Sequence, residues 1–234
     1  MKPQTGVGCK AERKCSRKPC HSAGLSFYGL ENKVMDLLYA SAYTFHALME
    51  NVYTFILGRK GHLKEVVLGF SEEDFHHLVG LHKLKDLDIA RANRQKVFRD
   101  ILAKRITCND LKKSSHFQNI SNRLETFPRL ETLLDTSQLV FRYNSKLYPY
   151  SAIKSELLIK MGDGIILEIA FLFLDKKDKE KSIYFCRSFF PLEKKDYTEG
   201  QMKYTLLKKE KKNLHTGQTK LLYDKLTSNE QNSK

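Results

Sequence analysis

The hydrophobic period of this chain changes once, near residue 138, and this change sets what the chain can fold into. From Leu30 to Val52, apolar residues recur at intervals of three and four, as in one face of an amphipathic helix. From residue 138 onward the period falls to two, which is typical of strands. Helices that precede the strands, rather than alternate with them, indicate an α+β fold.

The sequence before residue 138 predicts several helices and one link between two short apolar runs. GRKG at 58–61 contains turn residues, which suggests a hairpin or an irregular connection. Ser71 followed by acidic residues up to Asp74 is a capped helix start, so FHHLVGLHKL should be helical. Further helical patterns cover 94–105 and 109–134.

About five strands are predicted after the change in period. They cover residues 138–144, 153–160, 164–175, 182–192 and a last segment that begins near Gln201. The third and fourth are apolar on both faces and should be central, and a tight turn at Gly162–Gly164 indicates antiparallel pairing. The predicted fold is therefore α+β, with N-terminal helices packed on one face of a mostly antiparallel sheet of about five strands.

Basic residues gather at the two ends of the chain. The formal net charge is +14, and residues 1–24 and 203–225 contribute +5 each. Such an excess favours a polyanionic partner such as nucleic acid, although solvated lysine-rich ends are the alternative. We expect a flexible basic arm over 1–28, a single α+β domain over 29–212 and a polar tail over 213–234.

The cysteines and the apolar segments bear on cofactors and location. The arm holds four soft ligands for zinc, namely Cys9, Cys15, Cys20 and His21. Their spacing does not match the paired C-x2-C of zinc sites, so a basic arm without metal is the better interpretation. The first 24 residues lack the apolar core of a secretory signal, and the longest apolar stretch, 164–174, is shorter than a membrane helix. A cytoplasmic protein without membrane contact is expected.

FHHLVGLHKLKDL contains three of the eight histidines. No two of them stand four residues apart, and a continuous helix would turn by about 140° between His77 and His82, which argues against a helical zinc pair. His82 falls on the apolar stripe, where a packing role is the alternative to a functional one. His77 lies at the margin of the stripe, where it can reach a solvent-filled cleft.

Two features of the strand region also suggest chemistry. Arg187 lies in a predicted central strand, on the face of Phe185 and Phe189, where a charge needs a partner. That partner is either a carboxylate such as Glu168 or a bound phosphate. The connection DYTEGQ at 196–201 offers polar groups for a phosphate or a base edge, or is an ordinary loop.

Several common catalytic signatures are missing. The chain has no phosphate-binding GxxxxGK[ST] loop, no G-x-S-x-G elbow and no G-x-G-x-x-G. Its acidic residues form no obvious cluster for a two-metal nuclease. The remaining inventory of His, Lys, Arg, Tyr, Thr and Gln suits metal-free acid–base chemistry on a phosphodiester, so no cofactor is expected.

Five segments, in the order FHHLVGLHKLKDL, KVFRDILAKRIT, RLETFPRLETLLD, YFCRSFFP and DYTEGQMKYTLLKK, resemble the fourth family of phage-associated nucleases grouped with barnase, EndoU, colicin and RelE toxins. The resemblance covers about residues 70–210. It implies a core of one or two helices followed by a four-stranded antiparallel sheet. It also implies a ribonuclease borne by phages and mobile elements of Gram-positive bacteria, with RNA as substrate and an antitoxin or inhibitor protein as candidate partner.

The family patterns can be carried onto individual residues. F-x-H-L-x-G-L-H-K-L, R-S-F-F-P and D-Y-T-x-x-Q match Phe75, His77, Leu78, Gly80, Leu81, His82, Lys83, Leu84, Arg187, Ser188, Phe189, Phe190, Pro191, Asp196, Tyr197, Thr198 and Gln201. The resulting hypothesis is a metal-independent endoribonuclease that uses the ribose 2′-OH as nucleophile and leaves a 2′,3′-cyclic phosphate. An inactive nucleic-acid-binding module on the same fold, or a protein-binding regulator or antitoxin, remains the alternative.

Each candidate residue has an expected role in this hypothesis. His77 is expected to act as general base or acid, and Lys83 and Arg187 to stabilise the phosphate charge. The residues expected to contact the substrate are His82, Tyr197, Thr198, Gln201 and Lys208. We further expect His77, Lys83, Arg187, Tyr197 and Gln201 to meet in one cleft between the helices and the sheet.

Overall fold

The structure of the protein is a computed structural model that describes residues 36–178 and 182–227. The predicted basic arm, with Cys9, Cys15, Cys20 and His21, lies outside these residues. The helices are α1 (Leu37–Met49), α2 (Glu72–Leu78), η1 (Leu81–Lys83), η2 (Asp88–Ala90), α3 (Arg94–Leu102), α4 (Cys108–Leu111), α5 (Gln118–Thr126), η3 (Phe127–Arg129), α6 (Leu130–Thr136) and η4 (Ser145–Leu147). The strands are β1 (Asn51–Arg59), β2 (His62–Leu68), β3 (Leu139–Arg142), β4 (Leu157–Met161), β5 (Ala170–Lys176), β6 (Ile183–Pro191), β7 (Met202–Asn213) and β8 (Thr219–Asp224).

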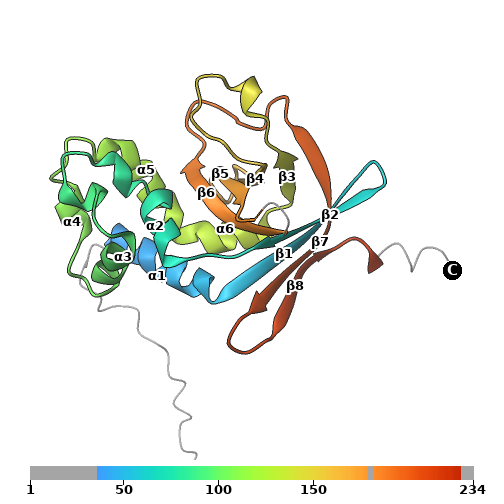
Figure 1. Cartoon of the computed structure of the whole chain (residues 1–234), viewed down its shortest axis with the longest axis horizontal. Coiled ribbons are helices and arrows are strands. Elements are labelled where there is room, and N and C mark those ends of the chain that lie inside the picture. Colours follow the sequence, from blue (N-terminus) through green and yellow to red (C-terminus); the bar gives the residue numbers. More distant parts are fainter. Residues whose placement is uncertain (1–35, 179–181, 228–234) are drawn as a thin grey trace, which may run out of the picture. The chain divides into compact units, whose positions relative to one another are not determined.

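Seven strands close into a barrel (Figure 1). Their order is β1-β2-β6-β5-β4-β3-β7, and β7 pairs again with β1. Every neighbouring pair is antiparallel except β2 and β6, which are parallel and share only the pairs Val67–Ile183 and Leu68–Tyr184. The extra strand β8 pairs with β7.

The prediction of helices packed on a five-stranded antiparallel sheet is therefore wrong. The first helix ends at Met49, before Val52, which was expected to continue its apolar stripe. Of the two connections considered for GRKG, the hairpin is the one that forms, between β1 and β2. This hairpin closes the barrel, because β1 pairs with β7 from near the other end of the sequence. Local periodicity carries no information about such a pairing. Residues 219–224, assigned to the polar tail, form β8.

The inside of the barrel is largely apolar and is continuous with the core of the helices. Phe55 and Leu57 of β1 are fully buried in it, as are corresponding residues of β2, β4 and β5. At one end, Lys64 of β2 forms an ion pair with Glu156, and the hydroxyl of Tyr184 in β6 donates a hydrogen bond to the same carboxylate. These contacts reinforce the short parallel seam between β2 and β6.

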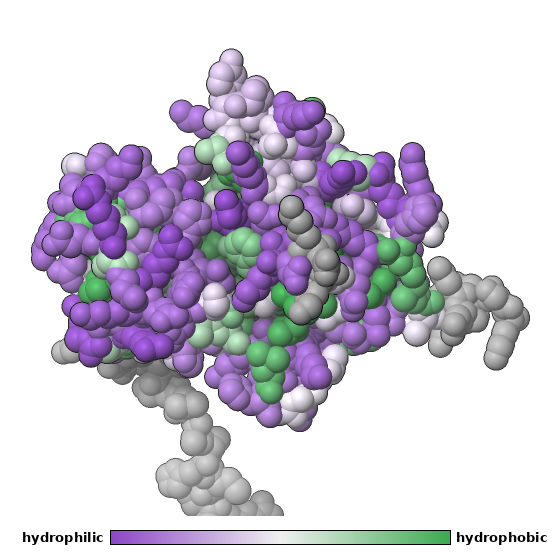
Figure 2. Space-filling view, in the orientation of Figure 1, coloured by the Kyte–Doolittle hydropathy of each residue, from purple (hydrophilic) through white to green (hydrophobic). Residues whose placement is uncertain are grey.

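Helices α1 to α5 gather on one side of the barrel (Figure 1). Phe45 of α1 packs against Phe75, Phe98 and Phe127, which ties α1 to α2, α3 and η3. Both α2 and α5 pack on β6, and α6 packs on β4. In the same view, hydrophilic residues cover most of the visible surface (Figure 2). The helices thus place side chains of α2 and α5 next to those of β6.

A second apolar cluster covers the opposite face of β3, β4 and β5. Its buried members are Phe141, Tyr143, Tyr148, Leu158, Phe171 and Phe173. Tyr197, from the loop after β6, packs on Phe171 and Phe173 with ring centroids 5.7 and 5.6 Å apart. The cluster therefore anchors the loop between β6 and β7 against the barrel.

Candidate active site

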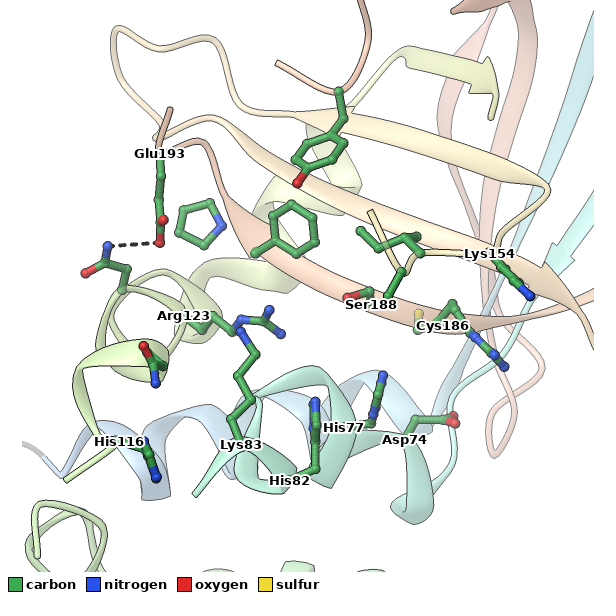
Figure 3. A pocket seen from close by; sticks show the side chains of 18 of the residues that line it. Asp74, His77, His82, Lys83, His116, Arg123, Lys154, Cys186, Ser188 and Glu193 are labelled. Carbon is green, nitrogen blue, oxygen red and sulfur yellow. Dashed lines mark hydrogen bonds between the residues drawn. The ribbon is translucent and has the colours of Figure 1, made fainter. Parts of the chain in front are cut away.

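A cleft of about 1560 Å³ lies between α2, the turn after it, α5 and β6 (Figure 3). Eight lysines and arginines but only three carboxylates line this cleft. The basic residues are Lys83, Lys85, Arg94, Arg123, Lys154, Arg187, Lys194 and Lys195, and the acidic ones are Glu73, Asp74 and Glu193. The cleft is therefore positively charged and attracts anions.

His77 and His82 stack on each other inside this cleft (Figure 3). Their ring centroids are 4.3 Å apart and their planes differ by 16°. The stack arises because α2 ends at Leu78 and Gly80 takes a left-handed conformation with φ +88°, which returns the chain over the helix end. A Cβ at Gly80 would also come within 2.9 Å of Ile120. The expectation of a continuous helix, with the two rings about 140° apart, is therefore wrong.

Both stacked histidines are held in the neutral form. Burial lowers the pKa of His77, and Arg94, Arg123 and Arg187 add to this effect. Burial also lowers the pKa of His82, to about 4, with a further contribution from His77. At neutral pH both rings can therefore accept a proton, and His77 is the one closer to the charges of Arg94 and Arg187.

Arg123 of α5 is a buried cation with few protein partners. It is only 9% exposed, and its one hydrogen bond to another described residue runs from Nη1 to the carbonyl of Leu78 at 3.4 Å. Its guanidinium lies 5.3 Å from the ring centroid of Phe190, and burial lowers its pKa to about 10. Most of its donors are left for a ligand in the cleft, and a planar guanidinium is well suited to a phosphate.

Lys83 extends from η1 into the same part of the cleft, beside Arg123 (Figure 3). The pKa of Lys83 is lowered by burial and by the positive charge of Arg123, while Glu193 acts in the opposite direction. The three groups therefore form a small charged cluster in which a second anion would relieve the repulsion between Lys83 and Arg123.

Arg187 reaches the cleft because β6 contains a bulge. The register between β5 and β6 shifts at Phe173 and Leu174, where Ser188 pairs with the first and Cys186 with the second. Arg187 is the additional residue and is exposed, whereas Phe189 is buried in the core of the barrel. The predicted alternation, with Arg187 and Phe189 on one face, is therefore wrong, since a bulge breaks it.

The sequence of the chain matches one protein family over most of its length. Residues 37–226 match the model of the phage-Barnase-EndoU-ColicinE5/D-RelE like nuclease 4 family. The chain belongs to this nuclease family. This confirms the resemblance found in the sequence motifs and accounts for a basic cleft, since a nuclease binds a polyanion. Comparison with curated proteins and with solved structures gave no match.

Hydrogen bonds within the loop at 196–201 and to neighbouring segments hold this part of the nuclease in place, and only part of the loop faces the cleft. The Asp196 carboxylate accepts hydrogen bonds from Lys160 and from the Thr198 hydroxyl, each at 2.5 Å. The Gln201 amide bonds to the backbone of Asn144 through both of its polar atoms. Tyr197 lines the cleft, but Thr198 and Gln201 do not. Thr198 stabilises the loop that presents Tyr197 by bonding within it, and Gln201 ties the end of the loop to Asn144 after β3.

The other candidate residues also fall into two groups, those that line the cleft and those that lie outside it. His77, His82, Lys83 and Arg187 line the cleft together with Tyr197. Lys208 of β7 does not, and its ammonium group pairs with Glu210 at 2.8 Å. The carboxylate of Glu168, considered as a partner of Arg187, instead accepts a hydrogen bond from Thr126 at 2.7 Å. Thr198, Gln201 and Lys208, which were expected to contact the substrate, therefore lie outside the cleft.

Sequence reasoning missed Arg123, although a signal was present. Ile120, Leu124 and Phe127 are buried on the same side of α5 and its extension, at the spacing of a helical stripe. An arginine within such a stripe must find polar partners or a ligand.

Two further features concern residues 36–178 and 182–227. These residues contain no group of three or more His, Cys, Asp or Glu side chains placed to hold a metal ion. None of their helices has the length and apolar character needed to cross a membrane.

The lowered pKa of His82 predicts that acid destabilises the folded nuclease. His82 takes up a proton near pH 6.5 when unfolded but only near pH 4 when folded, so the unfolded state binds more protons between these values. The free energy of unfolding should therefore fall as the pH decreases from about 6.5 to about 4. In urea titrations at pH 7 and pH 5, His82→Gln should show a smaller decrease than the parent chain.

A histidine outside the cleft provides the control for this experiment, because His82 is surrounded by other basic groups. Its charged form is further disfavoured by His77, Arg123, Lys83 and His76. His62 is exposed on β2, so His62→Gln should leave the pH dependence unchanged. An equal decrease in stability in His82→Gln and in the parent chain would contradict the prediction.

Proposed function

We propose that the protein is a metal-independent endoribonuclease that cleaves RNA by attack of the ribose 2′-OH on the adjacent phosphate. The observation that carries this proposal is the pair of neutral, stacked histidines beside Arg123, Arg187 and Lys83 in one cleft. RNA supplies its own nucleophile, so the protein needs a base, an acid and cations around the phosphate.

The residues of the cleft can be given distinct roles. His77 takes the proton of the 2′-OH, and the oxygen forms the new bond to phosphorus. Arg123 and Arg187 stabilise the added negative charge on the phosphate oxygens. Lys83, whose lowered pKa makes it a better proton donor, protonates the departing 5′-oxygen as its bond to phosphorus breaks. The products are a 2′,3′-cyclic phosphate and a 5′-hydroxyl, with one proton taken up and one released.

His82 and Tyr197 support these steps in the proposal. His82 holds the ring of His77 by stacking and, with a pKa of about 4, adds no positive charge that would repel a protonated His77 at neutral pH. Tyr197 lines the cleft near Arg123 and Glu193, where it can position the substrate. The two carboxylates on the α2 side are occupied, since Glu73 accepts from Gln95 and Asp74 from Ser71.

Cleavage in the presence of EDTA tests the proposal. We expect single-stranded RNA to be cut in EDTA, with 2′,3′-cyclic phosphate ends identified by mass spectrometry, while DNA of the same sequence stays intact because it lacks the 2′-OH. Cleavage only after metal is added, or equal cleavage of DNA, would overturn the mechanism.

A catalytically inactive nucleic-acid-binding module is the second candidate function, and the positive charge of the cleft favours it equally. Both candidates predict RNA binding that weakens steeply with salt, because phosphate contacts release counterions. Binding without any cleavage product, under conditions in which the chain is folded, would identify the module. Indifference to RNA would instead point to a regulator or antitoxin that binds protein.

A further inference from the structure

The cationic cleft also contains a neutral and acidic pair of side chains, next to Lys83 and Arg123. Asn122 of α5 and Glu193 of the loop after β6 both line it, and the Asn122 amide nitrogen donates to Glu193 Oε1 at 3.2 Å (Figure 3). A carboxylate in a cleft that binds a polyanion opposes phosphate binding. It therefore either balances nearby cations or recognises a part of the substrate that carries hydrogen-bond donors.

The Asn122–Glu193 pair presents two acceptor oxygens to the cleft. Glu193 Oε2 makes no hydrogen bond with another described residue, and one of the two N–H groups of the Asn122 amide donates to Glu193 Oε1. Asn122 Oδ1 lies 3.4 Å from the Ser121 hydroxyl, but that hydroxyl has a closer acceptor in the Gln118 carbonyl at 3.2 Å. Both side chains are exposed, so a ligand in the cleft can reach these oxygens.

An apolar wall lies next to this pair. Phe190 and Tyr197 line the same cleft and contact each other with ring centroids 5.2 Å apart. Burial raises the pKa of Tyr197, and the charge of Glu193 acts in the same direction. A flat ring packed against this wall could bring its polar edge to the Asn122–Glu193 pair.

From this arrangement we infer that the Asn122–Glu193 pair recognises a guanine base of a single-stranded RNA. Guanine is the base whose pairing edge offers two adjacent donors, N1–H and the N2 amino group, which match two acceptors. Uracil offers one donor between two acceptors, and adenine and cytosine one donor beside acceptors. The edge of a base is accessible in this way only in single strands. The inference rests on the proposed function, since it names the substrate of the same cleft.

Binding of oligonucleotides that cannot be cleaved tests this inference separately from catalysis. The probes are fully 2′-O-methylated uridine strands with one central guanine, adenine, cytosine or inosine. The guanine strand should bind about tenfold or more tightly than the adenine strand, as expected for a bidentate base contact. Inosine lacks the N2 amino group and should lose most of this preference.

Glu193→Gln and Asn122→Ala should reduce the preference for guanine without weakening binding of the all-uridine strand. Glu199→Gln is the matched control, because Glu199 is an exposed acid of the same loop that does not line the cleft. If Glu193→Gln strengthens binding of every strand equally, Glu193 only balances the cations, and the inference is overturned. Equal binding of all strands by the parent chain would overturn it as well.

The cleavage assay separates this inference from the proposed function. Cleavage of RNA in EDTA with no preference for guanine would refute base recognition and leave the ribonuclease standing. A preference for guanine in binding with no cleavage of unmodified RNA would refute the ribonuclease and retain the recognition site.

Discussion

Replacement of His77 by alanine should lower kcat for RNA cleavage by about 10²- to 10⁴-fold, the contribution typical of a general base. His77 lies in the cleft with its pKa lowered by burial and by Arg94, Arg123 and Arg187, so its ring is neutral and ready to accept a proton. The rate constant is measured with a single-stranded RNA at saturating concentration in EDTA, and the folded state is checked by thermal unfolding.

Two controls distinguish the loss of a base from a structural effect. His62→Ala removes an exposed histidine outside the cleft and should retain the parent rate. Added imidazole should restore part of the activity of His77→Ala, because it can occupy the vacated space and accept the proton. In the parent chain, kcat/KM should rise with pH until His77 is deprotonated, and this rise should be absent from the variant. A parent-like rate in His77→Ala would contradict the assignment.

Local structure in this nuclease was largely predictable from the sequence. The helix start at Ser71 and Asp74 is present as a capping box, and the segments at 138–144 and 182–192 contain β3 and β6. These features depend on neighbouring residues, which a sequence pattern records directly. The placement of His77 and Arg187 in one cleft follows from the same elements, since α2 packs on β6.

The barrel was not predictable, because its closure depends on contacts between distant segments. Val52 continued the helical stripe of α1, yet it lies in β1, where the chain pairs with Lys212 of β7. The parallel seam of β2 and β6 is short and is supported by Lys64 and Glu156, which are far apart in the sequence. Tertiary pairing of this kind overrides local propensity.

The histidine stack escaped prediction for a local reason. The helical stripe continued through FHHLVGLHKL, but Gly80 ends it with a left-handed residue, and a single glycine in a helical pattern does not say whether the helix stops. Once the chain reverses, His82 packs on His77 instead of facing away from it. The geometry of the proposed base therefore depends on one backbone conformation.

Arg123→Met should separate stability from activity in this protein. Methionine has a similar length and fills the same buried space beside Phe190. It removes a cation whose pKa is lowered by burial and that has one weak hydrogen bond to the rest of residues 36–178 and 182–227. Because the charge is poorly compensated in the folded chain, the free energy of unfolding should stay equal or rise by up to about 2 kcal/mol. Urea titration measures this change.

RNA cleavage by Arg123→Met should fall by about 10²- to 10³-fold, since a preorganised donor to the phosphate is lost. Arg123→Lys keeps the charge but not the planar pair of donors, so its rate should lie between those of the parent and Arg123→Met. If Arg123 instead served the fold, Arg123→Met would unfold at lower urea concentration, and its activity per folded molecule would be unchanged. A more stable protein with little activity is the expected result, because the donors that the fold leaves unpaired in Arg123 are those that a phosphate would use.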